Sequence, residues 1–200
     1  MLPLPPGDFR AYLFDCDGTI ADSMPAHYQA WQQTLDEYGC PFDEDLFYAW
    51  GGRPTAEVVA ELNRVHRLTM PVAEVDARRE HLFQQLVPAI QGVPGVLAHI
   101  DDAHGRIPIA VVSGSTRESV TASLSALNLM DRFDVLVCAG DYARGKPDPE
   151  CYLMAADLVG VAPEHCLVFE DTVLGLEAAR AAGMRAVRVP SPRERAALKG

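Results

Sequence analysis

Tyr12-Leu13-Phe14-Asp15-Cys16-Asp17-Gly18-Thr19 is the stretch of sequence that decides the fold. A short apolar run ends in two aspartates separated by one residue, and a Gly-Thr turn follows. Such apolar runs are typical of buried strands in parallel sheets, and ligands bind beyond the carboxyl ends of those strands. Two carboxylates at such an edge repel each other unless a cation or a proton is held between them. The stretch therefore predicts a metal site in which Asp15 could also serve as a nucleophile; a strand ending in a polar turn is the alternative.

Residues 24–88 carry helical patterns and no convincing strand. Apolar residues recur at helical spacing, and Gly and Pro residues such as Gly39 and Pro54 separate the patterns. We expect helices over residues 25–38, 43–50, 55–65 and 72–87.

From about residue 92 onward, helices and strands alternate. We expect helices over 96–104, 118–127, 149–159 and 174–182, and strands over 107–113, 133–138, 166–170 and 186–189. Units of this length predict an α/β fold with a doubly wound, parallel (Rossmann-like) sheet. Because the helical block interrupts this pattern after the first strand, we expect a core domain of residues 1–22 and 90–200 and an inserted helical cap domain of residues 23–89. Its hinges would be the connectors at residues 20–24 and 91–95.

Polar residues follow the other predicted strands. Ser113 and Gly114 follow one strand, Lys146 follows the next, and Glu170 and Asp171 follow a third. Singly, these are explained by a capped turn, a surface lysine or acids at a helix N-terminus. The carboxyl ends of parallel strands meet at one edge, however, so these residues can converge with the two aspartates of the opening stretch. The set then contains acids for Mg²⁺ and a lysine and a hydroxyl for a phosphate group.

The composition and net charge limit the classes of partner that we expect. Seventeen Lys and Arg against 28 Asp and Glu give a formal net charge of −11, and no basic stripe is present. Nucleic acids and anionic membranes need clustered cations, so we expect neither as a partner. No secretory signal or membrane-spanning run is seen, and an odd number of cysteines without metal-site spacing is typical of reduced thiols. We therefore expect a monomeric cytoplasmic protein that acts on a small molecule.

The motifs together resemble those of the haloacid dehalogenase (HAD) superfamily. The resemblance covers essentially the whole chain, and the helical insertion is similar to the family's C1 cap. The segments from Asp22 to Trp31 and from Phe169 to Gly183 resemble the β-phosphoglucomutase-like branch. Within that branch, the chain is most similar to small-cap sugar phosphatases of the fructose-1-phosphate/6-phosphogluconate type.

The resemblance implies a role for each motif residue. Asp15 would attack phosphorus and form an aspartyl-phosphate, and Asp17 would protonate the leaving oxygen and later activate water. Mg²⁺ would be held by Asp15, the carbonyl of Asp17, and Asp171, with Glu170 assisting. A further set would hold the phosphoryl oxygens: Ser113, Gly114 and Lys146.

In the cap, the resemblance points to the substrate-binding candidates His27, Arg53, Thr55 and Arg79. The related mutases carry an arginine where Thr55 falls; Arg53 is displaced from that position by two residues and could compensate. This difference favours a phosphatase over the first alternative, a phosphosugar mutase; the second is a non-catalytic phosphometabolite-binding protein. For Arg79 and the neighbouring Arg78, a solvated helix face is the competing interpretation.

Overall fold

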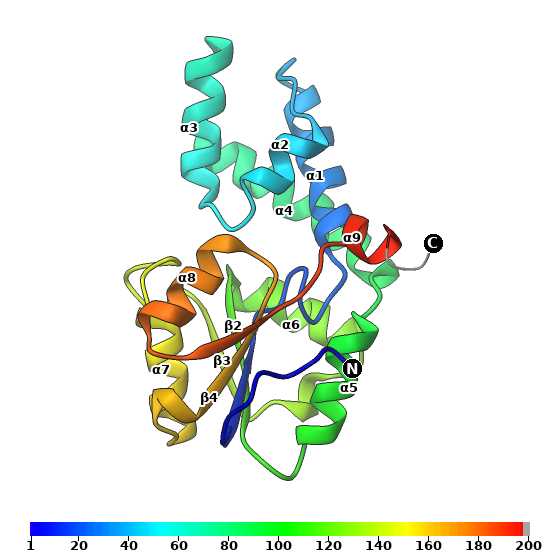
Figure 1. Cartoon of the computed structure of the whole chain (residues 1–200). Coiled ribbons are helices and arrows are strands. Elements are labelled where there is room, and N and C mark those ends of the chain that lie inside the picture. The colour runs from blue at the N-terminus through cyan, green and yellow to red at the C-terminus, as the bar shows by residue number, and fades with distance from the viewer. Residues whose placement is uncertain (198–200) are drawn as a thin grey trace.

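The computed structural model describes residues 1–197 and contains a five-stranded parallel sheet with helices on both faces (Figure 1). The strands are β1 (Ala11–Phe14), β2 (Ile109–Thr116), β3 (Val135–Ala139), β4 (Cys166–Glu170) and β5 (Arg185–Arg188). The α-helices are α1 (Met24–Asp36), α2 (Glu44–Ala49), α3 (Thr55–His66), α4 (Val72–Leu86), α5 (Pro94–Ala103), α6 (Arg117–Ala126), α7 (Glu150–Val159), α8 (Val173–Ala181) and α9 (Pro192–Ala197). Three short 3-10 helices are η1 (Val87–Ala89), η2 (Met130–Arg132) and η3 (Pro163–His165).

The strand that opens the chain lies at the centre of the sheet. The strand order is β3-β2-β1-β4-β5, with every neighbouring pair parallel. Tyr12 pairs with Ile109 on one side, and Ala11 pairs with Cys166 on the other. The predicted α/β class with a doubly wound sheet is therefore confirmed.

Each face of the sheet is covered by its own hydrophobic cluster. Side chains alternate along a strand, so Tyr12 and Phe14 of β1 face one cluster and Ala11 and Leu13 face the other. Helices α5 and α6 cover the first face, and α7 and α8 cover the second. The apolar run that opens the chain is thus buried on both sides, as its composition predicts.

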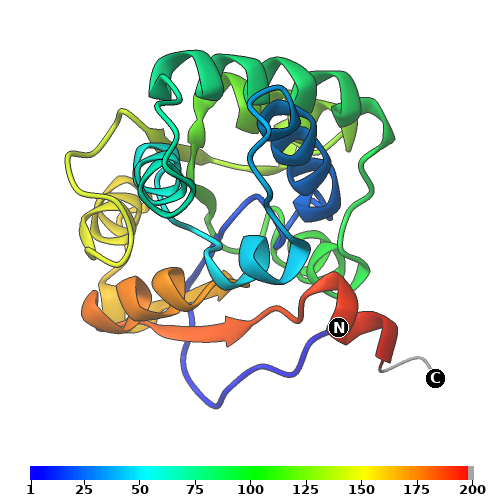
Figure 2. The ribbon, with the colours of Figure 1, turned by 90° about the horizontal axis from the view of Figure 1, so that it is seen from above.

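Helices α1 to α4 lie together above the carboxyl edge of the sheet (Figures 1 and 2). They bury a third hydrophobic cluster that includes Trp31, Phe47 and Leu62. The two segments that join them to the sheet run side by side, since the Asp22 N–H donates to the Gln91 carbonyl at 2.7 Å. In the following we call residues 23–89 the cap; that this segment is a separate domain stays a prediction.

The strand expected over residues 107–113 ends later than predicted. Strand β2 continues to Thr116, three residues beyond the predicted end, so Ser113 and Gly114 lie inside it and not in a loop after it. The extension is possible because the register with β3 shifts between Val112 and Thr116, which leaves an irregular stretch between two regular pairings.

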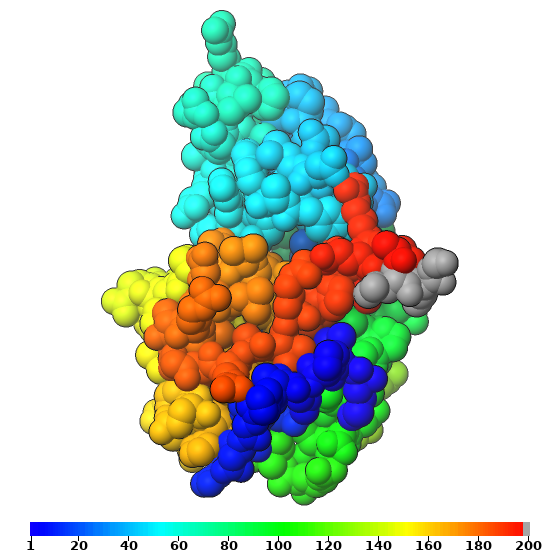
Figure 3. Space-filling model, in the orientation of Figure 1, coloured from blue at the N-terminus to red at the C-terminus, as the bar shows by residue number. Residues whose placement is uncertain are grey.

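The C-terminal helix α9 bridges the core and the cap. Arg193 forms ion pairs with Glu44, at 2.6 Å, and with Asp45, both in α2. Arg195 pairs at 2.6 Å with Asp22 in the connector between β1 and the cap. Figure 3 shows this red segment in contact with the cyan part of the cap. Within residues 1–197, none of the helices has the length and apolar character needed to span a membrane.

Candidate active site

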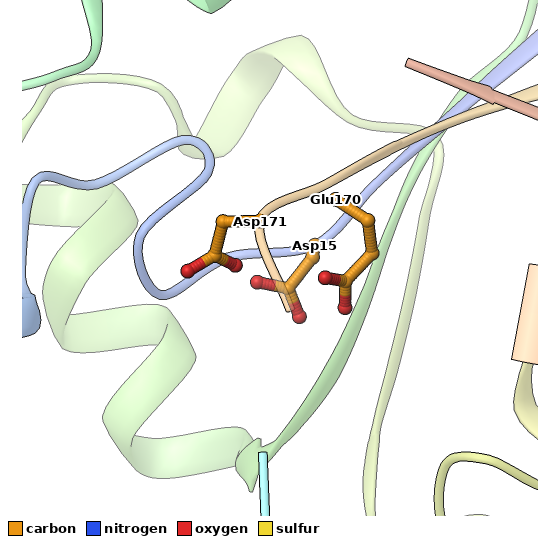
Figure 4. Close-up of side chains that lie close together, drawn as sticks. All are labelled: Asp15, Glu170 and Asp171. Carbon is orange, nitrogen blue, oxygen red and sulfur yellow. The ribbon is translucent and has the colours of Figure 1, made fainter. Parts of the chain in front are cut away.

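Three carboxylates and one lysine converge at the carboxyl edge of the sheet. Asp15 follows β1, Glu170 ends β4, and Asp171 comes next; their carboxyl groups point toward a common centre (Figure 4). One oxygen from each lies within 4.8 Å of the other two. Lys146 reaches the same point from the loop between β3 and α7. The convergence follows from the parallel topology, because every strand delivers its carboxyl end to this edge.

Lys146 forms hydrogen bonds to two of the carboxylates. Its Nζ donates to Asp15 Oδ1 and to Glu170 Oε1, both at 2.7 Å, and to the Val112 carbonyl at 3.2 Å. The ammonium also lies 5.1 Å from the ring centre of the buried Tyr152. All three hydrogen bonds of the ammonium are thereby used, which fixes the lysine side chain although it comes from a loop.

The acids outnumber the cation that neutralises them. Burial, with the charges of Glu170 and Asp17, raises the pKa of Asp15 to about 8, although Lys146 acts in the opposite direction. Burial and the charges of Glu170 and Asp15 likewise raise the pKa of Asp171 well above its usual range. A divalent cation would relieve this excess of buried negative charge, and carboxylate oxygens are the ligands that Mg²⁺ prefers. The residues present therefore fit a Mg²⁺ ion.

Glu170 is held in place from the protein side. Its Oε2 accepts hydrogen bonds from the backbone N–H of Thr172, at 2.6 Å, and from the Thr172 hydroxyl, at 2.9 Å. The same hydroxyl caps helix α8 by accepting from the Gly175 N–H at 3.0 Å. A Cβ on Gly175 would lie 1.9 Å from Glu170 Oε1, so only glycine lets the helix pass this close to the carboxylate. Gly18 makes a similar approach to Asp171, at a φ of +84°.

Asp17 is surrounded by hydrogen-bond donors. Its Oδ1 accepts from Ser23 Oγ at 2.7 Å and lies 3.1 Å from His27 Nε2, and its Oδ2 accepts from Ser115 Oγ at 2.7 Å. Burial would raise the pKa of Asp17, but the charge and hydrogen bond of His27 and the two serine hydroxyls outweigh burial and hold it well below its usual range. The His27 ring is itself stacked on Phe83, with 3.8 Å between ring centres.

Ser23 and Ser115 are site residues that the sequence analysis did not single out. Ser23 lies eight residues after Asp15, and Ser115 lies two residues after Ser113. Their positions next to recognised motif residues were the available signal. Tyr142 also went unnoticed: it lines the site, and its hydroxyl donates to the Ser113 carbonyl at 3.0 Å.

A cavity of about 600 Å³ lies between the cap and the sheet edge, and the carboxylate and lysine cluster forms part of its wall. Asp15, Asp17, Ser113, Gly114, Lys146 and Glu170 line it from the core. The cap contributes His27, Arg53, Thr55 and Arg79, together with the aromatic side chains of Trp31, Phe42, Phe47 and Trp50. Asp171 is absent from this lining within the described residues, although it belongs to the acidic cluster.

The two neighbouring arginines of α4 face different surroundings. Arg78 is exposed and pairs with Glu37 at 2.7 Å, which agrees with a solvated helix face. For Arg79 that interpretation is wrong, because its side chain is only 14% exposed and lines the cavity. The helical phase of α4 separates the two residues by about 100°, a difference that motif alignment alone does not resolve.

A parallel sheet, a helical insertion after the first strand and an acidic cluster with a fixed lysine define a known class of hydrolases. The sequence matches the model of the family described as haloacid dehalogenase-like hydrolase over residues 12–189. The chain belongs to this family, as its motifs indicate, and it is an enzyme.

Individual relatives cover nearly the same length. The chain is 37% identical to fructose-1-phosphate phosphatase YqaB of Escherichia coli, over 90% of this chain and 96% of that protein. It is 31% identical to a phosphorylated carbohydrates phosphatase of Thermotoga maritima, over 89% and 83% of the two chains. Among solved structures, CbbY of Rhodobacter sphaeroides in complex with xylulose-(1,5)bisphosphate is 27% identical, covers 91% of this chain and 86% of that chain, and has a TM-score of 0.79.

Proposed function

We propose that this enzyme is a Mg²⁺-dependent phosphatase that hydrolyses a small phosphorylated metabolite, a sugar phosphate, through an aspartyl-phosphate. One observation carries the proposal: the cavity ends on a buried cluster in which Asp15 is fixed by Lys146 and has Asp17 as its neighbour. The relatives named as phosphatases of phosphorylated sugars support the substrate class.

The first step transfers the phosphoryl group to the enzyme. An oxygen of the Asp15 carboxylate attacks phosphorus, a P–O bond to Asp15 forms, and the P–O bond to the sugar breaks. The sugar oxygen leaves with a proton from Asp17. Asp17 receives this proton from His27: when His27 is protonated, its Nε2–H lies 3.1 Å from the Asp17 carboxylate.

The second step regenerates the nucleophile. Asp17, again a carboxylate, accepts a proton from water, the water oxygen attacks phosphorus, and inorganic phosphate leaves Asp15. The donors around Asp17 favour its charged form, so Asp17 enters this step able to accept a proton, whereas its acid role in the first step depends on the proton of His27.

The remaining residues of the cluster would bind the metal ion and the phosphoryl oxygens. Asp15, Asp171 and the carbonyl of Asp17, assisted by Glu170, would hold Mg²⁺, which supplies positive charge beside the phosphoryl oxygens when bound. Ser113, the Gly114 N–H and Lys146 would bind those oxygens from the other strands. The cap residues would bind the sugar.

The decisive test is the variant Asp15→Asn. We expect it to abolish phosphate release from p-nitrophenyl phosphate, because an amide oxygen is a poor nucleophile, while its melting temperature stays near or above that of the wild type. Turnover within tenfold of the wild type would refute Asp15 as the nucleophile. Tight sugar-phosphate binding without any Mg²⁺-dependent turnover of the wild type would instead indicate a binding protein.

The mutase alternative is tested with β-glucose 1-phosphate. A mutase converts it to glucose 6-phosphate, whereas the proposed phosphatase releases inorganic phosphate. We expect phosphate release, since Thr55 stands where the related mutases carry an arginine.

A further inference from the structure

Arg79, a cation that lines the cap side of the cavity, is already paired with two acids. Its guanidinium lies 3.0 Å from Asp76 Oδ1 and 3.5 Å from Glu80 Oε2, and both acids line the cavity with it. The side chain of Arg79 is only 14% exposed, and that of Glu80 is 28% exposed. The Arg79–Glu80 pair is therefore part of the cavity wall, whereas the side chain of Asp76 is 51% exposed.

Neighbouring side chains hold this group in position. The guanidinium carbon of Arg79 lies 5.6 Å from the ring centre of the buried Trp31. Glu80 Oε1 accepts a hydrogen bond from Gln84 Nε2 at 2.7 Å. The Trp31 ring and the Gln84 amide thus help to hold the Arg79 guanidinium and the Glu80 carboxylate at the cavity wall, with the more exposed Asp76 beside them.

The charges of the cap wall balance. Asp76 and Glu80 together exceed Arg79 by one negative charge. The other cap arginine of the lining, Arg53, is exposed and lies 5.1 Å from the ring centre of Trp50. A phosphate group carries about −1.5 to −2 charge near pH 7 and is bound by unpaired cations. Arg53 has no ion pair within the described residues, but the four charges of the wall sum to zero, so the wall carries no net positive charge for a second phosphate.

We propose that Asp76 and Glu80 determine specificity: they neutralise Arg79 and restrict the cavity to substrates whose end remote from the scissile phosphate is uncharged and carries hydroxyl groups. Carboxylates accept hydrogen bonds from hydroxyls and repel a phosphate. This inference rests on the proposed function, and it deepens the substrate class from sugar phosphates to sugar monophosphates.

The expected preference for monophosphates distinguishes this chain from a relative of the same fold. CbbY of Rhodobacter sphaeroides was solved with a bisphosphate bound. Discrimination between the two ligand classes here comes from repulsion, which excludes the wrong ligand as effectively as added contacts favour the right one.

The test compares matched pairs of ligands: fructose 1-phosphate with fructose 1,6-bisphosphate, and glucose 6-phosphate with glucose 1,6-bisphosphate. We expect the wild type to have a higher kcat/KM for the monophosphates. Glu80→Gln removes one charge without changing side-chain length, and we expect it to reduce the preference by about tenfold, chiefly through a lower KM for the bisphosphates. Asp76→Asn should act in the same direction, but more weakly, because Asp76 is 51% exposed.

Glu74→Gln is the matched control. Glu74 lies on the same helix, is exposed, and is not among the cavity-lining residues within the described part of the chain. We expect this variant to keep the wild-type preference. An unchanged monophosphate preference in Glu80→Gln, or a wild type that favours the bisphosphates, would overturn the inference.

Measurements of ligand binding test this inference independently of the proposed catalytic function. The Asp15→Asn chain, with Mg²⁺ present, is titrated calorimetrically with the same pairs, with and without Glu80→Gln. We expect the monophosphates to bind more tightly than the bisphosphates and Glu80→Gln to narrow the gap. If the wild type hydrolyses none of the phosphomonoesters, the proposed function fails, and these affinities still decide whether the cap wall selects monophosphates.

Discussion

At the scale of single residues, the active site contains three carboxylates around one ammonium. Lys146 contacts Asp15 and Glu170, and Asp171 has no share in that ion pair within the described residues. A buried carboxylate without a full counter-charge destabilises the fold unless it binds a proton or a cation. Stability should therefore depend on both pH and Mg²⁺.

The pKa of Asp15 gives the sign of this dependence. Burial raises it from 3.8 to about 8, so between about pH 4 and pH 8 the folded chain binds a proton that the unfolded chain has released. The contribution of Asp15 to the free energy of unfolding is present at the lower end of that window and is lost as the pH rises through it. Without Mg²⁺, we expect the melting temperature to fall from pH 5 to pH 8. Mg²⁺ should raise it more at pH 8 than at pH 5, because protons compete with the ion.

Thermal melts at both pH values, with and without Mg²⁺, measure this coupling. The Asp15→Asn variant is the control, because an amide does not titrate, and we expect it to flatten both trends. A stabilisation by Mg²⁺ that is equal at the two pH values would contradict the assignment of the cluster to the ion.

Gly175 is a second residue whose replacement has a definite outcome. In Gly175→Ala, the added Cβ would lie 1.9 Å from Glu170 Oε1, and either the carboxylate or helix α8 must shift. We expect a loss of about 3 kcal/mol of unfolding free energy from overpacking and a disturbed buried ion pair, together with weaker Mg²⁺ binding.

Gly114→Ala is the matched control for stability, because no atom lies within 4 Å of a Cβ built there. We expect its denaturant midpoint to stay near that of the wild type. If Gly175→Ala also unfolds at the wild-type midpoint, the close packing of α8 against Glu170 is not what fixes the carboxylate.

Residues that belong to a recognisable motif spacing or follow a strand could be predicted from the sequence, whereas residues placed only by packing could not. Asp15 and Lys146 could be proposed because parallel strands deliver their ends to one edge. Ser115 lies beside a recognised motif residue, but the sequence did not indicate its hydrogen bond to Asp17, which it makes from the irregular stretch of β2. Arg78 and Arg79 are equivalent by composition, and only the phase of α4 places one of them in the cavity.

At the scale of elements, helix α9 is the feature that sequence patterns did not indicate. Its two arginines reach the cap and the connector after β1, and Arg193 also lies 5.4 Å from the ring centre of Tyr48. The exposed pairs of Arg193 contribute little to global stability, and the Arg195–Asp22 pair is partly buried; both can hold one element against another.

We expect Arg193→Gln and Arg195→Gln to loosen the cap without unfolding the protein. Hydrogen exchange should become faster in α2 and around Asp22, while the free energy of unfolding falls by at most about 1 kcal/mol for Arg193→Gln and by more for Arg195→Gln, whose pair is partly buried. Arg106→Gln, which breaks an exposed pair with Asp102 on α5, should leave exchange in the cap unchanged. Equal exchange in α2 for all three variants would show that α9 does not restrain the cap.

At the scale of the whole molecule, the alternation of strands and helices predicted the sheet, while the size and lining of the cavity depend on how the cap packs. The clusters on the two faces of the sheet contain only residues outside 24–89. A fourth cluster joins both parts through Ala21, Phe83 and Ile90. Most of the core packing is thus independent of the cap, in line with the proposed division into two domains.

Replacing residues 24–89 by a short Gly-Ser linker tests that division. We expect the shortened chain to fold cooperatively, with a lower melting temperature because Ala21 and Ile90 lose their partners. It should hydrolyse p-nitrophenyl phosphate slowly and lose any preference among sugar phosphates, since the aromatic and arginine wall is gone. Circular dichroism and a substrate panel provide the readouts, with Asp15→Asn in the same background as the control. A shortened chain without cooperative unfolding would show that the core needs the cap.

The central position of β1 also has a consequence for how the chain is made. Strand β1 can pair on both sides only after Ile109, the partner of Tyr12, and Cys166, the partner of Ala11, have been synthesised. Helices α1 to α4, in contrast, pack against partners close in sequence. During synthesis, the helical segment can therefore form while β1 still exposes an unpaired edge, which is prone to aggregation. On stalled ribosomes, we expect protease protection of residues 24–89 to precede that of β1, and protection in the reverse order would contradict this sequence of events. The chemistry of the opening stretch is then assembled only after β4 has emerged.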